Sequence, residues 1–184
     1  MGTRYVALLR GINVGGNNPV PMAGLREAFA ELGATDVRTY IQSGNVLFDG
    51  GADDHDTWVK RLEAELATRF DYHARVTLRT HEELRRVVEG APKGFGRDPD
   101  AYRSDVIFLL GPSTATEAVA QMCARDGVDS MAAGDGVVYF ERLVARITQT
   151  YLSKIVGTPI YREMTIRNWR TTTTLLRMLD ERGG

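Results

Sequence analysis

The residues best suited to hold a ligand form a glycine- and asparagine-rich stretch near the start of the chain. It runs over residues 10–18 as Arg-Gly-Ile-Asn-Val-Gly-Gly-Asn-Asn, and a helix is predicted to begin soon afterwards at Pro21. Glycine lets backbone N–H groups approach a ligand closely, and the start of a helix carries positive partial charge. This combination favours an anion or phosphate site. The spacing matches neither the P-loop nor the dinucleotide-binding fingerprint, so it indicates no particular nucleotide.

The elements around this loop predict which other side chains lie beside it. Strands are predicted over residues 5–9, 37–42, 45–49 and 73–80, with helices from Pro21 and from residue 56 or 57. The order strand, helix, strand, strand, helix, strand is that of a ferredoxin-like fold, whose right-handed crossovers give the strand order 4-1-3-2. In this sheet the end of the first strand meets the start of the third, so the loop and the Ser43-Gly44 turn share one edge.

Polar side chains gather at this predicted edge and define the first part of a candidate ligand-binding site. They are Arg10, Asn13, Gly15, Gly16, Asn17, Gln42, Ser43 and Asn45. Amides and hydroxyls are costly to bury without hydrogen bonds. Either they bond to one another and to the loop as purely structural motifs, or they bind a ligand, and the sequence leaves both interpretations open.

The C-terminal region supplies the second part of the candidate site because it is strongly basic. Residues 142–182 include eight basic side chains and three acidic ones. Residues 165–171 read Thr-Ile-Arg-Asn-Trp-Arg-Thr, and arginine beside an aromatic residue is typical of phosphate binding or base stacking. The candidate ligand-binding residues taken from this region are Lys154, Arg167 and Asn168. Trp169 is expected to pack in the core instead.

The second half of the chain repeats the order of elements without a clear residue-by-residue match. Strands are predicted over residues 105–110, 129–132 and 137–142, with helices over 113–125, from Thr148 or Thr150 to Gly157, and over 165–182. A helix thus stands where a fourth strand is expected. We predict an α+β fold of two ferredoxin-like (βαββαβ-type) subdomains with antiparallel sheets, the second ending in helices. They are expected to span residues 1–90 and 104–184, joined by a linker over 91–103.

The composition argues against several classes of protein. Lys and Arg number 23 against 24 Asp and Glu, so the overall charge gives no attraction to nucleic acid or to anionic membranes. No apolar run approaches the roughly 20 residues that a membrane span requires. Cys123 is the only cysteine, and its helical-looking surroundings predict a buried, inert thiol. These features predict a cytoplasmic protein that makes no membrane contact.

Metal and catalytic sites receive little support from the sequence. The three histidines, His55, His73 and His81, lie on different predicted elements without metal-ligand spacing, so no metal site is predicted. No histidine is placed to activate Ser43, so a hydrolase triad is not indicated. Neither a cofactor nor a catalytic residue can be identified.

Several of the segments described above together resemble a known family. Residues 8–18, the Pro21-Met22 helix start and residues 39–46 are similar to the bacterial domain of unknown function 1697 family, and residues 167–171 resemble its closing motif. The resemblance implies a cytoplasmic fold of two ferredoxin-like subdomains. It implies no activity, because none is attached to the family, and no catalytic residue is carried over.

Three hypotheses about function follow. The first is a binding protein for a small anionic or phosphorylated ligand or a nucleotide; nucleic acid ranks lower, because the first-half strands expose no clear aromatic pair beyond Tyr40. The second is an enzyme of unidentified class that uses the same pocket. The third is that the motifs are structural and lock the two halves together.

Overall fold

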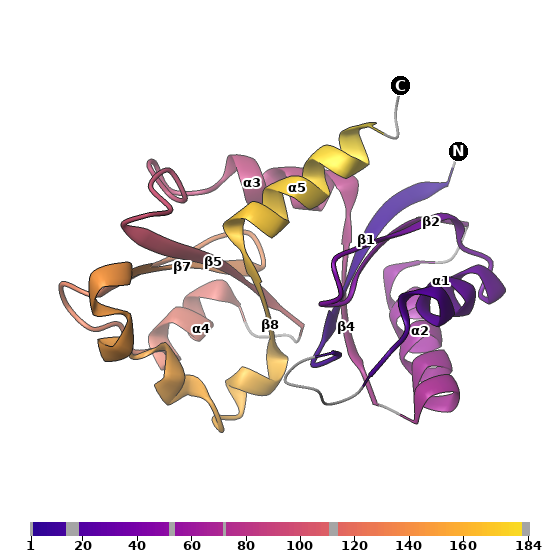
Figure 1. Ribbon diagram of the computed structural model, residues 1–184, viewed down its shortest axis with the longest axis horizontal. Coiled ribbons are helices and arrows are strands. Elements are labelled where there is room, and N and C mark those ends of the chain that lie inside the picture. Colours follow the sequence, from indigo (N-terminus) through magenta and orange to yellow (C-terminus); the bar gives the residue numbers. More distant parts are fainter. Residues whose placement is uncertain (1, 14–18, 52–53, 72, 111–113, 182–184) are drawn as a thin grey trace. The chain divides into compact units, whose positions relative to one another are not determined.

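The structure of the protein, a computed structural model, describes residues 2–13, 19–51, 54–71, 73–110 and 114–181 (Figure 1). The chain forms two compact units, Met1–Leu84 with Leu175–Gly184, and Arg85–Thr174. Each unit contains one four-stranded antiparallel sheet with helices interleaved along the chain. The predicted α+β class with two antiparallel sheets is therefore confirmed.

The first unit follows the predicted order of elements. Its strands and helices are β1 (Thr3–Arg10), α1 (Met22–Glu31), β2 (Thr35–Tyr40), β3 (Asn45–Gly50), α2 (His55–Phe70) and β4 (Arg75–Thr80). The strands lie in the order β2-β3-β1-β4, which is the predicted 4-1-3-2 arrangement read from the other edge. Helix α3 (His81–Glu89) follows β4 and continues into the second unit.

The core of the first unit lies between its sheet and two helices. Figure 1 shows α1 and α2 on one face of the sheet. Phe48 of β3 is at the centre of this core, with ring centroids 5.4 Å from Tyr5, 5.2 Å from Phe29 and 5.0 Å from Trp58. Strand β1 is buried along most of its length, as its continuous apolar run predicted.

The second unit repeats this arrangement. Its elements are β5 (Tyr102–Leu109), α4 (Ala115–Gln121), β6 (Asp129–Ala133), β7 (Val137–Leu143), three 3-10 helices (Val144–Gln149, Leu152–Ile155 and Ile160–Glu163), β8 (Met164–Asn168) and α5 (Trp169–Asp180). The strand order is β6-β7-β5-β8, so this sheet has the same topology as the first. A full capping box, in which Thr114 and Glu117 bond to each other's backbone N–H groups, starts α4.

The structure corrects three expectations for the second half. The helix predicted over 165–182 is wrong at its start, because residues 164–168 form β8 and pair with β5 from Leu109 to Asp105. The helix predicted to end at Gly157 is replaced by short 3-10 segments. Cys123 lies just after the end of α4 and is exposed, so the prediction of a buried thiol is wrong.

Among the helices that the structure describes, none combines the length and the apolar composition of a membrane-spanning segment.

Candidate functional site

The loop after β1 and the turn before β3 meet in the first unit, as the topology predicted. The backbone N–H of Leu9 donates to the carbonyl of Gly44 at 2.8 Å, and Asn13 Nδ2 donates to the carbonyl of Gln42 at 3.0 Å. We call the predicted site residues gathered here the first-unit corner: Arg10, Asn13, Gln42, Ser43 and Asn45. The predicted residues Gly15, Gly16 and Asn17 lie outside the described residues.

Both asparagines of the first-unit corner use their amides inside the unit. Asn13 has a left-handed backbone (φ 52°), and its Nδ2 also donates to the carbonyl of Val20 at 3.0 Å while its Oδ1 accepts from Val20 N at 2.8 Å. Asn45 is fully buried, and its Nδ2 donates to the Tyr40 carbonyl and to Ser43 Oγ, each at 3.1 Å. These bonds fix the loop against the turn, which is what the structural interpretation of these two side chains predicts.

Lys154 and Arg167, both in the second unit, lie in different surroundings from each other. Lys154 is exposed, and its Nζ is 3.3 Å from the centroid of the Tyr151 ring, a cation–π contact. Arg167 is on β8 opposite Val106 and is only 9% exposed. Burial lowers the pKa of Arg167 to about 10, because the charged guanidinium loses water. That these residues and the first-unit corner line one cleft stays a prediction.

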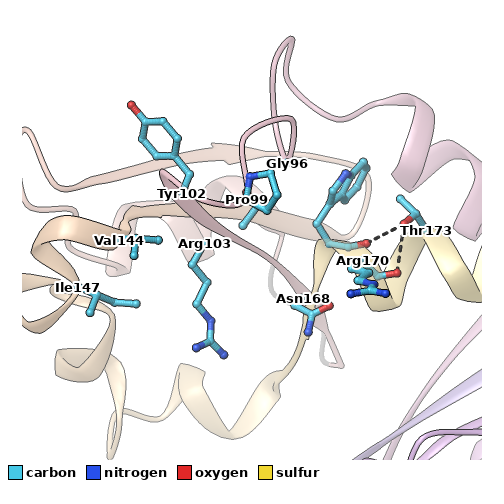
Figure 2. Close-up of a pocket in the computed structure, with 11 residues that line it drawn as sticks. Gly96, Pro99, Tyr102, Arg103, Val144, Ile147, Asn168, Arg170 and Thr173 are labelled. Atoms are coloured by element: carbon cyan, nitrogen blue, oxygen red, sulfur yellow. Dashed lines mark hydrogen bonds between the residues drawn. The ribbon is translucent and has the colours of Figure 1, made fainter.

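A pocket of about 710 Å³ in the second unit contains the last predicted residue, Asn168 (Figure 2). Three stretches of chain supply its walls: the segment entering β5, the start of the first 3-10 helix, and the junction of β8 with α5. The lining residues are Gly96, Pro99, Tyr102, Arg103, Ser104, Val144, Ile147, Asn168, Trp169, Arg170 and Thr173. We call it the basic pocket, because its two charged side chains are Arg103 and Arg170.

The pocket forms at the end of the second sheet where β8 stops and β5 continues without a described partner on that side. The β5–β8 pairing ends with Asp105 opposite Asn168, after which the chain turns into α5. The backbone N–H of Leu110 donates toward the β8 side, to the Glu163 carbonyl. Because such groups alternate along a strand, those of Ser104 point to the same side. No strand of the described chain pairs with Ser104 on that side, and Ser104 lines the pocket.

Cationic and amide groups line one side of the basic pocket. Asn168 Oδ1 accepts a hydrogen bond from the backbone N–H of Thr171 at 2.7 Å and so caps α5, while Asn168 Nδ2 makes no hydrogen bond to the described residues. Arg170 is exposed and forms no ion pair among the described residues. Arg103 Nε is 3.9 Å from Asp105 Oδ2, but the closer partner of that carboxylate is Arg142.

Apolar and aromatic side chains line the rest of the pocket. Tyr102 and Val144 are 42% and 40% exposed, which is unusual for large apolar side chains in this protein. In the view of Figure 2, Val144 and Ile147 lie on the side opposite Asn168 and Arg170, with Arg103 between them. One wall of the pocket thus suits a planar or apolar group, and another wall suits an anion.

Trp169 is only partly in the core, contrary to the expectation from the sequence. Its ring packs edge-to-face on Phe95, with centroids 5.2 Å apart, and it also lines the basic pocket. Gly96 allows this approach: a Cβ there would lie 1.9 Å from Trp169 Cδ1, and its φ of +69° already favours glycine. Residues 95–103, predicted to be linker, thus supply part of the core and wall of the second unit.

Of the residues that line the basic pocket, only Asn168 is among the candidate site residues predicted from the sequence. Arg170 lies in the basic C-terminal region that the sequence shows, but Tyr102 and Arg103 fall in the predicted linker because the predicted strand begins at Asp105. The alternation of Tyr102, Ser104 and Val106 with Arg103 and Asp105 is a signal that extends this strand backwards.

Comparison with known proteins agrees with this fold. The family model described as "Protein of unknown function (DUF1697)" matches residues 2–139. A solved structure of the conserved bacterial protein SP0830 from Streptococcus pneumoniae is similar to this chain, with 30% sequence identity and a TM-score of 0.83, covering 97% of this chain and 99% of that one. None of the curated proteins compared with the chain matches it. The match over residues 2–139 spans more than half of the 184 residues, and the chain therefore belongs to the DUF1697 family.

Proposed function

We propose that the protein binds a small ligand that carries a phosphate or carboxylate group beside an aromatic or apolar group. The site is the basic pocket of the second unit. The anion lies against Arg103, Arg170 and the Nδ2 group of Asn168, and the apolar part of the ligand packs on Tyr102, Val144 and Ile147.

One observation carries this proposal: two arginines line the same pocket, of which Arg170 forms no ion pair among the described residues and Arg103 reaches only Asp105, at 3.9 Å from its Nε. An arginine that forms no ion pair retains its donors for a ligand, and guanidinium groups bind phosphate and carboxylate in a two-pronged geometry. The start of α5 adds positive partial charge on the same side. The pocket offers cations, an amide and aromatic rings, and this composition favours binding over acid–base catalysis.

Isothermal titration calorimetry with phenyl phosphate, benzoate and neutral benzyl alcohol tests the proposal at low ionic strength. We expect the two anions to bind and the neutral alcohol to give no measurable heat. Arg103→Ala and Arg170→Ala are each expected to weaken phenyl phosphate binding about tenfold or more, because each removes hydrogen bonds to a charged group.

Arg162→Ala is the matched control. Arg162 is an exposed arginine of the same unit and does not line the pocket. It removes one positive charge from the unit, so it corrects for long-range attraction between protein and anion. The proposal is wrong if none of the anions binds, or if Arg162→Ala weakens binding as much as Arg103→Ala and Arg170→Ala do.

A further inference from the structure

Glu141 lies directly behind one wall of the basic pocket. It is on β7 opposite Ser104 of β5, and the Ser104 hydroxyl donates to Glu141 Oε1 at 2.5 Å. The same oxygen accepts the backbone N–H of Gly96 at 3.1 Å. Ser104 and Gly96 both line the basic pocket, so these two bonds hold the carboxylate close to it.

A second, smaller pocket of about 310 Å³ shares Tyr102 with the basic pocket. Its walls are Tyr102, Gly127, Val128, Asp129, Ser130, Glu141 and Leu143. Tyr102 belongs to both pockets, so the two pockets adjoin at this residue. None of the described residues that line this second pocket is basic, and we call it the acidic pocket.

The two carboxylates of the acidic pocket differ in their bonding. Asp129 accepts hydrogen bonds on both oxygens, from Thr150 Oγ1 at 2.6 Å and from two backbone N–H groups at 2.9 Å. Glu141 uses only Oε1; within the described residues its Oε2 makes no hydrogen bond, and no basic side chain pairs with it. Lys93 lines a third pocket together with Glu141 but forms no ion pair with it. Glu141 Oε2 therefore keeps its capacity to accept from a cation.

The basic and acidic pockets, which share Tyr102, thus present opposite charges. We propose that Glu141 determines specificity, and that the ligand carries a protonated amine as well as an anionic group. This inference rests on the proposed function, because the anion in the basic pocket places the amine. The amine lies past Tyr102 and donates to Glu141 Oε2, so the ligand class is that of ω-amino carboxylates, ω-amino phosphates and peptide-like zwitterions.

Calorimetry with 4-aminobutanoate, 6-aminohexanoate and 8-aminooctanoate, each beside its N-acetyl form, tests this inference. Acetylation removes the positive charge of the amine and leaves the carboxylate in place. We expect at least one chain length to bind about tenfold more tightly as the free amine, because a charge-assisted hydrogen bond is lost on acetylation.

Glu141→Gln is the decisive variant, because it keeps a carbonyl acceptor for Ser104 and Gly96 and removes the charge. It is expected to abolish the preference for the free amine and to leave the binding of phenyl phosphate within about twofold. Glu89→Gln is its control, since Glu89 is exposed at the end of α3 and lines none of the three pockets.

Equal binding of the free and acetylated forms at every length, or no binding of either, overturns the inference. A preference for the amine that survives in Glu141→Gln also overturns it. The phenyl phosphate titration decides the proposed function separately: if phenyl phosphate binds and no amine preference appears, the basic pocket is an anion site and the role of Glu141 is rejected.

Discussion

The first-unit corner and the basic pocket are both rich in polar side chains, yet they use them in opposite ways. In the corner, Asn13 and Asn45 donate to backbone carbonyls and to Ser43, and Asn45 is fully buried. In the basic pocket, the guanidinium of Arg170 and the Nδ2 group of Asn168 form no ion pair or hydrogen bond with the described residues. A high density of amides and hydroxyls is therefore a weaker sign of a binding site than hydrogen-bonding capacity that the fold leaves unused.

This difference has a physical origin. A turn that brings two loops together leaves backbone groups without strand partners. A buried backbone group that stays without a hydrogen bond destabilises the fold by about 1–3 kcal/mol. Asn13 and Asn45 supply those partners. The basic pocket is open to water, so its cations incur no such penalty when they are unpaired.

Gly44→Ala, in the turn of the first-unit corner, is expected to have the largest effect on the free energy of unfolding. The new Cβ would lie 2.8 Å from Ile12 and 2.9 Å from Leu9, at a φ of +76°. Backbone strain and overpacking together are expected to lower the free energy of unfolding by about 3 kcal/mol. Urea denaturation measures the change, with Trp58 as the fluorescence reporter of the first unit in a Trp169→Phe background.

Gly33→Ala separates the two causes. Gly33 has a similar φ of +93°, but a Cβ there meets nothing within 4 Å. It is expected to cost only about 1 kcal/mol, from backbone strain alone. If both variants lowered the free energy of unfolding equally, close packing around Gly44 would not contribute to the stability of the first-unit corner.

Asn45→Ala is expected to have the next largest effect. It leaves the Tyr40 carbonyl and Ser43 without the amide that they bond to, and should lower the free energy of unfolding by about 2 kcal/mol. Gln42→Ala, which truncates an exposed side chain of the same corner, should change it by less than about 0.5 kcal/mol. Binding of phenyl phosphate should be unchanged in both. Weakened binding in Asn45→Ala at a temperature where the variant is folded would contradict the contrast drawn above.

Asn168 both bonds within the fold, through Oδ1, and lines the basic pocket. Its variants therefore test a structural role and a binding role at one position. Asn168→Ala removes the cap of α5 and should cost about 1 kcal/mol of stability as well as some anion affinity. Asn168→Asp keeps the capping oxygen and should restore stability, while its charge repels the anion. Thermal denaturation together with phenyl phosphate titration measures both effects. If Asn168→Asp binds the anion as well as the natural protein does, Asn168 does not contact the ligand.

Arg170→Ala is expected to have the smallest effect on stability. The side chain is exposed and forms no ion pair among the described residues, so the free energy of unfolding should change by less than about 0.5 kcal/mol. In the same variant, phenyl phosphate affinity falls, as proposed above. A loss of stability comparable to that of Asn45→Ala would mean that Arg170 supports the fold, which would remove the distinction between the two regions.

The sequence by itself determined most of the first unit. Hydrophobic runs, the turn at Ser43-Gly44 and the rule of right-handed crossovers led to the observed strand order and to the contact of the loop with the turn. These signals act between neighbours along the chain or through general rules of connection, so they can be read without coordinates.

Local pattern was not sufficient in the second unit. Residues 164–168 run without a turn signal into the helix that follows, so the two were predicted as one helix. Only pairing with β5, about 60 residues earlier in the chain, makes this segment a strand. Cys123 is exposed for a related reason, because α4 ends at Gln121 instead of continuing to residue 125.

The basic and acidic pockets were decided by tertiary structure alone. Their walls come from segments around residues 96–104, 127–147 and 168–173, and no spacing in the sequence relates them. The sequence shows which side chains are charged or polar. Whether each one bonds within the fold or remains available to a ligand depends on which distant backbone and side-chain groups the folded chain brings within hydrogen-bonding distance, and that is a property of three-dimensional packing.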